Sequence, residues 1–316
     1  MHREAGQASF AEALVRGGGN RRLERISALL DWSVLGALLA GIYASSTGRP
    51  SYPPMVLFKV LLLQGWYGLS DPAMEEALAD RLSFRRFAGL GLDEAVPDHS
   101  TISRFRTLLA ERGLAEAAFA EVTSQLDGRG VTIKGGTLID ATVIEAAAEP
   151  PRQTGGGRSA ADPDAAWVKR ADGSARFGYK LHAAVDLGTG IVRRAAVTPA
   201  NVADVDLGHD LVIGDERTVY ADKAYVGPRL RERLKAGGIR NRVQQKAQKN
   251  KPLTPRQRLR NRLIGRIRGR VEGVFGTLKR SYGLGRMRYM GLGRNAAATF
   301  LTLIAWNLAR AADQAA

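Results

Sequence analysis

The chain has 316 residues, of which 45% are apolar, with a net charge of +16 and no cysteine. The apolar content is enough for the core of one large folded domain or two ordinary ones, and the lack of cysteine excludes disulfides, thiolate metal sites and a cysteine nucleophile. The apolar runs near residues 32–43 and 55–69 are too short to span a bilayer and no secretory signal is visible, so we expect a cytoplasmic protein without a membrane partner.

Residues 21–125 carry apolar residues three and four apart, with short breaks at Pro and Gly, which is typical of short helices. In "SDPAMEEALADRL", Ser70 or Asp71 is a candidate N-cap. "VPDHSTISRFRTLLAERG" repeats the pattern with Asp98 or Ser100 as its cap. We therefore expect an all-helical N-terminal domain over residues 1–125. A helix-turn-helix that binds DNA, dimerisation and a purely structural role all stay open for it.

From Val131 onwards, β-branched and alternating residues predict strands. "TLIDATVIEA", "RFGYKLHAAVD" and "GIVRRAAVT" are expected to form an antiparallel meander, and "RTVYAD" adds a further strand. Between the first two strands, "PPRQTGGGRSAADPD" is predicted to be a surface excursion. Lys180 and His182 share one face of the second strand and could approach a site or DNA, although a histidine there is more often a packed or surface residue.

Two aspartates in these strands are candidate metal ligands. Asp140 interrupts the apolar "GTLIDATVI", where an isolated charge is costly unless it is paired or binds metal, and Asp222 closes "VYAD" at the end of its strand. Mg²⁺ takes oxygen ligands, and two such ions can stabilise both oxygens of an in-line phosphoryl displacement. Asp186, Asp215 and Glu145 are rival carboxylates, of which Asp186 has a turn role before "LGTG".

The positive charge is concentrated between Arg229 and Arg294. This segment contains 21 Lys or Arg against two acidic residues, Glu232 and Glu272, for a net charge of +19, whereas the rest of the chain sums to −3. Such a block suits a polyanion, of which nucleic acid is the commonest. The alternative is a solvated face kept for solubility.

Within this segment a long helix is predicted to begin at Thr254-Pro255, with a core stripe made of Ile264, Ile267, Val271, Val274, Phe275 and Leu278. At about 100° per residue, Arg268, Glu272 and Lys279 share the edge beside that stripe. The next stripe has no side chains, because it consists of Gly265, Gly269, Gly273 and Gly276. Glycine in a helix costs roughly 0.8–1 kcal/mol relative to alanine, so we expect a large partner to approach there. Helix packing through small residues is the alternative.

Asp140 in "LIDAT", Asp222 in "YADKAYVG" and Glu272 in "RGRVEGVFGTLKRSYG" resemble the three acidic residues of DDE transposases from bacterial insertion sequences, in the group named after insertion sequences four and five. The signature of that family is Tyr, two residues, Arg, three residues, Glu, six residues, Lys. Arg268, Glu272 and Lys279 stand at those spacings, but Gly265 replaces the tyrosine. The "FGYKLHAAVDLGTG" and "VPDHSTISRFR" segments are also similar, so the resemblance covers nearly the whole chain.

The resemblance implies an α/β fold, in which a ribonuclease H-like catalytic core over residues 126–316, a mixed sheet with flanking helices, follows the all-helical domain. It implies a transposase that cleaves and joins double-stranded DNA at the terminal inverted repeats of its element and at target sites, working as a homodimer on paired ends. Asp140, Asp222 and Glu272 would hold two Mg²⁺ (or Mn²⁺) ions. The DNA contacts would come from seven basic residues: Arg262, Arg266, Arg268, Lys279, Arg280, Arg286 and Arg288.

Two other classes of protein stay open on the sequence alone. A structure-specific metal-dependent nuclease could share the fold and the carboxylates, but it would cut without defined ends and without joining the products. A catalytically inactive DNA-binding protein could keep the basic segment, and its carboxylates would then be dispensable.

Overall fold

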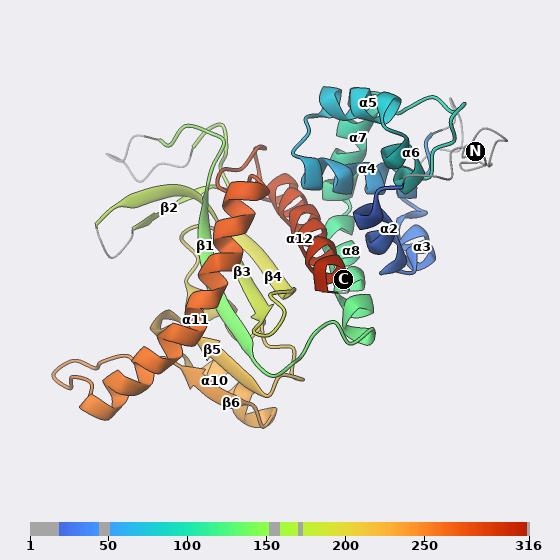
Figure 1. The fold of residues 1–316 in the computed structure, drawn as a ribbon. Helices are drawn as coiled ribbons and strands as arrows, with labels where there is room; N and C mark the ends of the chain where they lie inside the picture. Colours follow the sequence, from blue (N-terminus) through green and yellow to red (C-terminus); the bar gives the residue numbers. More distant parts are fainter. Residues whose placement is uncertain (1–18, 44–50, 152–158, 170–172, 315–316) are drawn as a thin grey trace. The chain divides into compact units, whose positions relative to one another are not determined.

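The structure is a computed structural model that describes residues 19–43, 51–151, 159–169 and 173–314 (Figure 1). The chain divides into two compact units, which are described separately. One contains Met1–Arg129 together with Ala296–Ala316, and the other contains Gly130–Asn295. The sequence interpretation assigned residues 296–316 to the catalytic domain, whereas in the structure they cluster with the N-terminal residues.

The first unit is helical, as its sequence predicts. Its N-terminal part comprises α2 (Arg21–Ala28), α3 (Trp32–Leu39), α4 (Pro54–Tyr67), α5 (Asp71–Asp80), α6 (Leu82–Ala88), α7 (His99–Glu111) and α8 (Leu114–Gly128). They are joined by the part of α12 (Leu292–Gln314) that begins at Ala296. None of the helices among the described residues combines the length and the apolar character that crossing a membrane requires.

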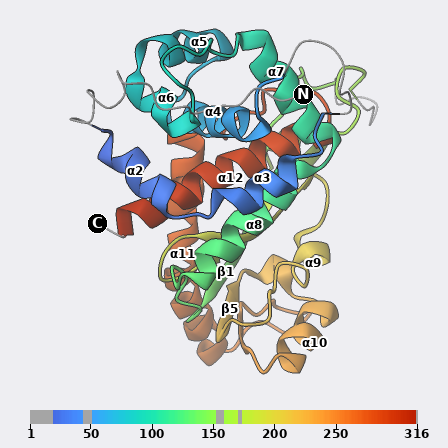
Figure 2. The same cartoon turned by 90° about the vertical axis from the view of Figure 1, so that its right-hand side faces the viewer.

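Capping and aromatic packing explain how these helices are arranged. Ser70 caps α5 by accepting a hydrogen bond from the Ala73 amide, and Asp98 caps α7 through the Thr101 amide at 2.7 Å. Figure 2 shows α12 lying between α4 and the pair α3 and α8. There the half-buried Trp66 indole donates to the Ala305 carbonyl at 2.8 Å, which ties α4 to α12.

The second unit is built on a six-stranded mixed sheet. Its strands are β1 (Thr137–Glu145), β2 (Ala166–Lys169), β3 (Ala175–Asp186), β4 (Val192–Pro199), β5 (Thr218–Ala221) and β6 (Arg240–Val243). The order is β2-β3-β1-β5-β6, with β4 also paired to β3. The β1, β3 and β4 pairings are antiparallel and form the predicted meander, and β1–β5 and β5–β6 are parallel. This arrangement confirms the expected α/β class with a mixed sheet.

Helices cover the two faces of this sheet (Figure 2). On one face lies α10 (Pro228–Ala236), whose Leu230 and Leu234 join a buried cluster with Ile139 of β1 and Val219 of β5. On the other face lies α11 (Pro255–Ser281), which contacts β1 and β5. The short α9 (Asp204–Leu207) and the 3₁₀ turn η1 (Lys223–Tyr225) pack against each other near the ends of β4 and β5.

The sequence did not predict β2 and β6. β6 reads "RNRV" and has only one buried residue, so it lacks the apolar alternation that indicates a strand. β2 begins two residues after the predicted surface excursion ends at Asp164, and it pairs with the first four residues of β3. Residues 152–158 of that excursion lie outside the described residues.

Candidate active site

Asp140 is a partly buried carboxylate on the face of β1 that α11 covers. One Arg268 guanidinium nitrogen, Nη1, lies 2.7 Å from Asp140 Oδ2. Burial raises the pKa of Asp140 to about 6; Arg268 opposes this shift, and the nearby charges of Asp222 and Asp204 add to it. The carboxylates of Asp222 and Asp204, from two other segments, are therefore close enough to Asp140 to disfavour its charged form, which is costly in the absence of a cation.

Asp222 reaches the same place through the parallel pairing of β1 with β5. The last residue pair in that register is Ile139 with Ala221, and Asp140 and Asp222 directly follow it. Asp222 also caps η1, because its Oδ1 accepts the Ala224 amide at 2.6 Å. The parallel pairing therefore places the two predicted aspartates next to each other at the point where β5 ends.

Helix α11 presents the third predicted carboxylate from the edge that meets β1. On that edge, Arg268 pairs with Asp140, and Lys279 Nζ donates to the Val143 carbonyl at 2.8 Å. Glu272 lies between these two contacts along the helix, but its side chain is exposed and has no hydrogen bond or ion pair within the described part of the chain. The structure thus brings Asp140 and Asp222 together and leaves Glu272 outside that pair.

The residues fit a divalent ion held by Asp140 and Asp222. No cluster of three or more Asp, Glu or His side chains at metal-binding distance occurs among the described residues. Mg²⁺, however, commonly binds proteins through only one or two carboxylates and keeps its other positions for water and phosphate oxygens. In this structure the Arg268 guanidinium supplies the positive charge at Asp140.

Asp204, at the start of α9, is a residue of this site that sequence reasoning missed. Lys180 Nζ donates to Asp204 Oδ1 at 2.9 Å and to the Val202 carbonyl at 2.7 Å. His182 Nδ1 lies 3.8 Å from the same carboxylate oxygen. Lys180 and His182 are both buried, and both are directed toward Asp204. Asp140, Asp204 and Asp222 are together called the acidic cluster below. In the sequence, Asp204 stands in the polar "NVADVD", where nothing separates it from an ordinary helix cap.

The rival carboxylates have structural partners instead. Asp186 accepts hydrogen bonds from the Lys134, Gly188 and Thr189 amides, which confirms its turn role. Asp215 pairs with Arg193 at 2.8 Å and Lys134 at 2.9 Å. Glu145 pairs with Arg176 at the end of β1. In the described part of the chain, the partners of these three carboxylates do not include Asp140 or Asp222.

The seven predicted DNA-binding residues fall into two groups. Arg268 and Lys279 make the contacts to β1 given above and are only partly exposed. The other five side chains are exposed, although Arg286 also donates to the Ala146 and Ala147 carbonyls. This exposed set consists of Arg262, Arg266, Arg280, Arg286 and Arg288.

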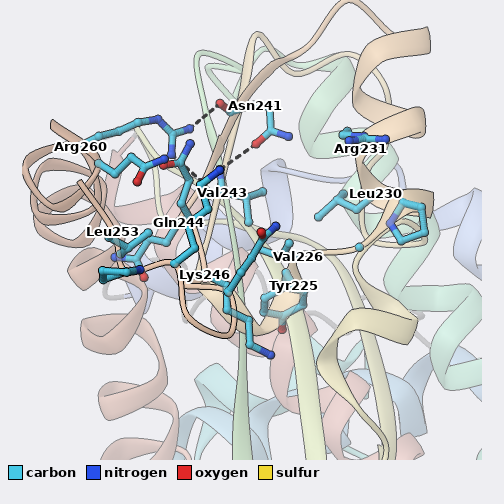
Figure 3. A pocket seen from close by; sticks show the side chains of 17 residues that line it. Tyr225, Val226, Leu230, Arg231, Asn241, Val243, Gln244, Lys246, Leu253 and Arg260 are labelled. Atoms are coloured by element: carbon cyan, nitrogen blue, oxygen red, sulfur yellow. Dashed lines mark hydrogen bonds between the residues drawn. The ribbon is translucent and has the colours of Figure 1, made fainter. Parts of the chain in front are cut away.

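A pocket of about 850 Å³ lies between η1, β6 and the start of α11 (Figure 3). None of the 17 described residues that line it is acidic, and its charged groups are all basic. At its rim, Arg260 donates to the Val243 and Asn241 carbonyls at 2.9 and 3.1 Å, so the arginine caps the outer edge of β6. A basic concavity thus borders η1, the turn that Asp222 caps.

Gly265 occupies the position of the signature tyrosine. A Cβ atom there would lie 3.3 Å from Nε2 of Gln244, which itself donates to the Asn261 carbonyl at 2.9 Å. Gln244 therefore fills the space into which a larger side chain at position 265 would begin to grow. Gly269 and Gly273 face open space, so the glycine stripe does not serve helix packing at these two positions.

Two known protein families match parts of this chain. Residues 132–308 match the family described as "Transposase DDE domain", and residues 11–108 match a second family, described as "Transposase domain (DUF772)". No solved structure matched the chain. The first match covers more than half of the 316 residues and includes all three predicted acidic residues. The chain therefore belongs to the transposase DDE domain family, whose members cleave DNA and transfer its strands with the help of divalent metal ions.

Proposed function

We propose that Asp140, Asp222 and Glu272 of this transposase together bind two divalent ions, Mg²⁺ or Mn²⁺, at the phosphate that is cut at the terminal inverted repeats of its insertion sequence. The observation that supports this most is the β1–β5 register, in which two carboxylates directly follow the last pair, Ile139 with Ala221. Glu272 lies on the edge of α11 that faces β1, between two contacts to that strand. To join the two aspartates, its exposed side chain has to turn from solvent toward them.

The residues of the chain divide the work of the reaction. Asp140 and Asp222 supply oxygen ligands from the sheet, and Glu272 supplies one from α11. Divalent ions, when bound, stabilise the charge on the attacking and leaving oxygens of an in-line phosphoryl displacement. Arg268, which now neutralises Asp140, becomes available to a phosphate once another cation replaces it there. No covalent enzyme intermediate is required.

The exposed arginines bind the phosphate backbone. Arg262 and Arg266 lie on the outward face of α11, and Arg280, Arg286 and Arg288 follow at and beyond its C-terminal end. They belong to the segment with a net charge of +19, so the affinity for double-stranded DNA is expected to fall steeply with salt. The same segment lines the basic pocket beside Asp222.

Three finer assignments complete the proposal. The spacing of Arg268, Glu272 and Lys279 supports the group named after insertion sequences four and five, with Gly265 in place of tyrosine. Residues 1–125 form the part that recognises the element ends or dimerises. Cleavage of paired ends requires a homodimer on DNA, because each end presents its own scissile phosphate.

Single isosteric replacements test the proposed site. Asp140→Asn, Asp222→Asn and Glu272→Gln should each abolish Mg²⁺-dependent cleavage and joining of DNA that carries the element ends, because each removes the charge of one ligand. Glu232→Gln is the matched control, since it neutralises the other acidic residue of the basic segment, and it should leave cleavage unchanged. Retained cleavage in any of the three variants would remove that residue from the site. Cutting without defined ends or joining would identify a nuclease instead.

A further inference from the structure

Tyr225 is a fully buried tyrosine whose hydroxyl group is not used by the fold. It follows Asp222 by three residues, and its ring belongs to the core cluster with Leu230 and Ile139. Its Oη atom has no hydrogen-bond partner among the described residues. Buried hydroxyls normally have one, and an unsatisfied group costs about 1–3 kcal/mol, so a phenylalanine would serve the core better.

The position of the ring is set by close packing against α9. A Cβ atom on Gly208, which follows that helix, would lie 3.0 Å from Tyr225 Cδ1 and 3.4 Å from Leu230 Cδ2. The bare backbone of Gly208 therefore lets α9, with Asp204 at its start, approach the tyrosine. This close packing, together with the core cluster around the ring, limits the positions that the hydroxyl can take.

The charges of three nearby aspartates act on this hydroxyl. Burial raises the pKa of Tyr225 well above its usual value, and the charges of Asp204, Asp140 and Asp222 raise it further. Figure 3 shows the ring at the wall of the basic pocket, with its oxygen directed away from Asn241 and Arg260. The hydroxyl is thus buried, and it lies close enough to the three aspartates for their charges to act on it.

Of the three aspartates, Asp140 is the one that would need a new donor. Asp204 is held by Lys180, and Asp222 by the Ala224 amide. The side-chain partner of Asp140 is Arg268, the group that a divalent ion would replace. A carboxylate that binds a metal through one oxygen is commonly fixed by a hydrogen bond to the other.

We propose that Tyr225 is a positioning residue, whose hydroxyl donates a hydrogen bond to the Asp140 carboxylate when a divalent ion takes the place of Arg268. This inference rests on the proposed function, in which Asp140 is a metal ligand. The unsatisfied hydroxyl of the free protein is then a donor held ready for the metal-bound state. Tyr225 acts through Asp140 and does not itself touch the DNA.

The test compares Tyr225→Phe with Tyr179→Phe in the full chain. Both tyrosines are fully buried, but the Tyr179 hydroxyl donates to Asp162 at 2.6 Å. The probe is Mn²⁺ without DNA, with binding followed by electron paramagnetic resonance. Tyr225→Phe should weaken Mn²⁺ binding and slow single-turnover cleavage, each by about 10–100-fold. Its metal-free thermal midpoint should not fall. Tyr179→Phe should instead lower the thermal midpoint and leave Mn²⁺ binding unchanged.

Asp140→Asn, measured alongside, separates the possible failures. If Asp140→Asn loses Mn²⁺ binding but Tyr225→Phe binds the ion like the unaltered protein, the positioning role is wrong and the metal site stands. Slower cleavage with unchanged Mn²⁺ affinity would overturn it in the same way, because the hydroxyl would then act on DNA. A lower metal-free thermal midpoint in Tyr225→Phe would mean that the hydroxyl has a structural partner. If Asp140→Asn binds Mn²⁺ normally, the proposed site itself fails.

Discussion

His182 is a fully buried ionisable residue beside the acidic cluster. Its Nε2 lies 3.0 Å from the Thr198 hydroxyl, whereas Nδ1 has no hydrogen-bond partner within the described structure. Burial lowers the pKa of His182 to about 4; Asp204 opposes this shift and Lys180 adds to it. The side chain is therefore neutral at neutral pH, and its protonation must oppose folding.

This burial predicts a loss of stability in acid. Because the folded-state pKa lies below the ordinary value of 6.5, the contribution of His182 is fully present above that pH and is lost as the pH falls toward about 4. As the pH falls, the free energy of unfolding of His182→Gln should therefore decrease by up to roughly 3 kcal/mol less than that of the unaltered chain. Chemical unfolding at several pH values between about 4 and 8 measures it. His99→Gln, at an exposed histidine paired with Glu75, is the control. The same pH slope in His182→Gln as in the unaltered chain would contradict the interpretation.

At the level of single residues, the sequence predicts some site residues and misses others for physical reasons. Asp140 is predictable because a charge inside an apolar strand requires a partner or a metal. Asp204 and Tyr225 could not be predicted as site residues, since an aspartate at the start of a short helix and a tyrosine after a strand have many ordinary roles. Their significance depends on tertiary neighbours: Lys180 for Asp204, and Gly208 for Tyr225.

At the scale of elements, α11 could be predicted almost to the residue. Thr254 forms a capping box with Gln257, Pro255 opens the first turn, and the apolar stripe has helical spacing throughout. β6 could not be predicted, because it is a short polar strand that exists through its pairing with β5. Its outer edge is covered by Arg260 of α11, which donates to the Val243 and Asn241 carbonyls. The spacing of apolar residues gives no sign of this contact between polar groups.

The glycine stripe of α11 leads to a prediction about surface rather than packing. Gly269 and Gly273 face open space, so their replacement by alanine should stabilise the helix by up to about 1 kcal/mol each. If DNA approaches this face, Gly269→Leu should depress DNA cleavage steeply, while the thermal midpoint falls little. Gly36→Ala, at an open helical position in α3, is the control for the gain in stability alone.

Two results would separate the readings of this stripe. A more stable double alanine variant with depressed DNA cleavage would place DNA, or a loop that moves with it, against these glycines. Full activity of both the double alanine and the Gly269→Leu variants would contradict the approach of DNA and leave the stripe without a functional reason.

In the molecule as a whole, the boundaries of the basic segment differ from the boundaries of the two compact units. The segment with a net charge of +19 runs through α10, β6 and α11 and belongs to the sheet-containing unit, whereas the remaining residues are slightly acidic. The helical unit is assembled from both ends of the chain, because Ala296–Ala316 clusters with the first 129 residues. Sequence patterns predicted the helices themselves, but this long-range grouping depends on contacts such as Trp66 with Ala305.

We propose that Glu272 joins Asp140 and Asp222 around the metal ions, although its side chain is exposed in this structure. The most direct measurement is DNA cleavage by Glu272→Cys with Mg²⁺ and with Mn²⁺, in a chain that otherwise has no cysteine. Mn²⁺ accepts a thiolate ligand more readily than the harder Mg²⁺ does. We expect Glu272→Cys to show no cleavage with Mg²⁺ and partial recovery of cleavage with Mn²⁺, whereas Glu232→Cys should cleave DNA with either ion. A ratio of Mn²⁺ to Mg²⁺ activity in Glu272→Cys equal to that of the unaltered protein would contradict this proposal.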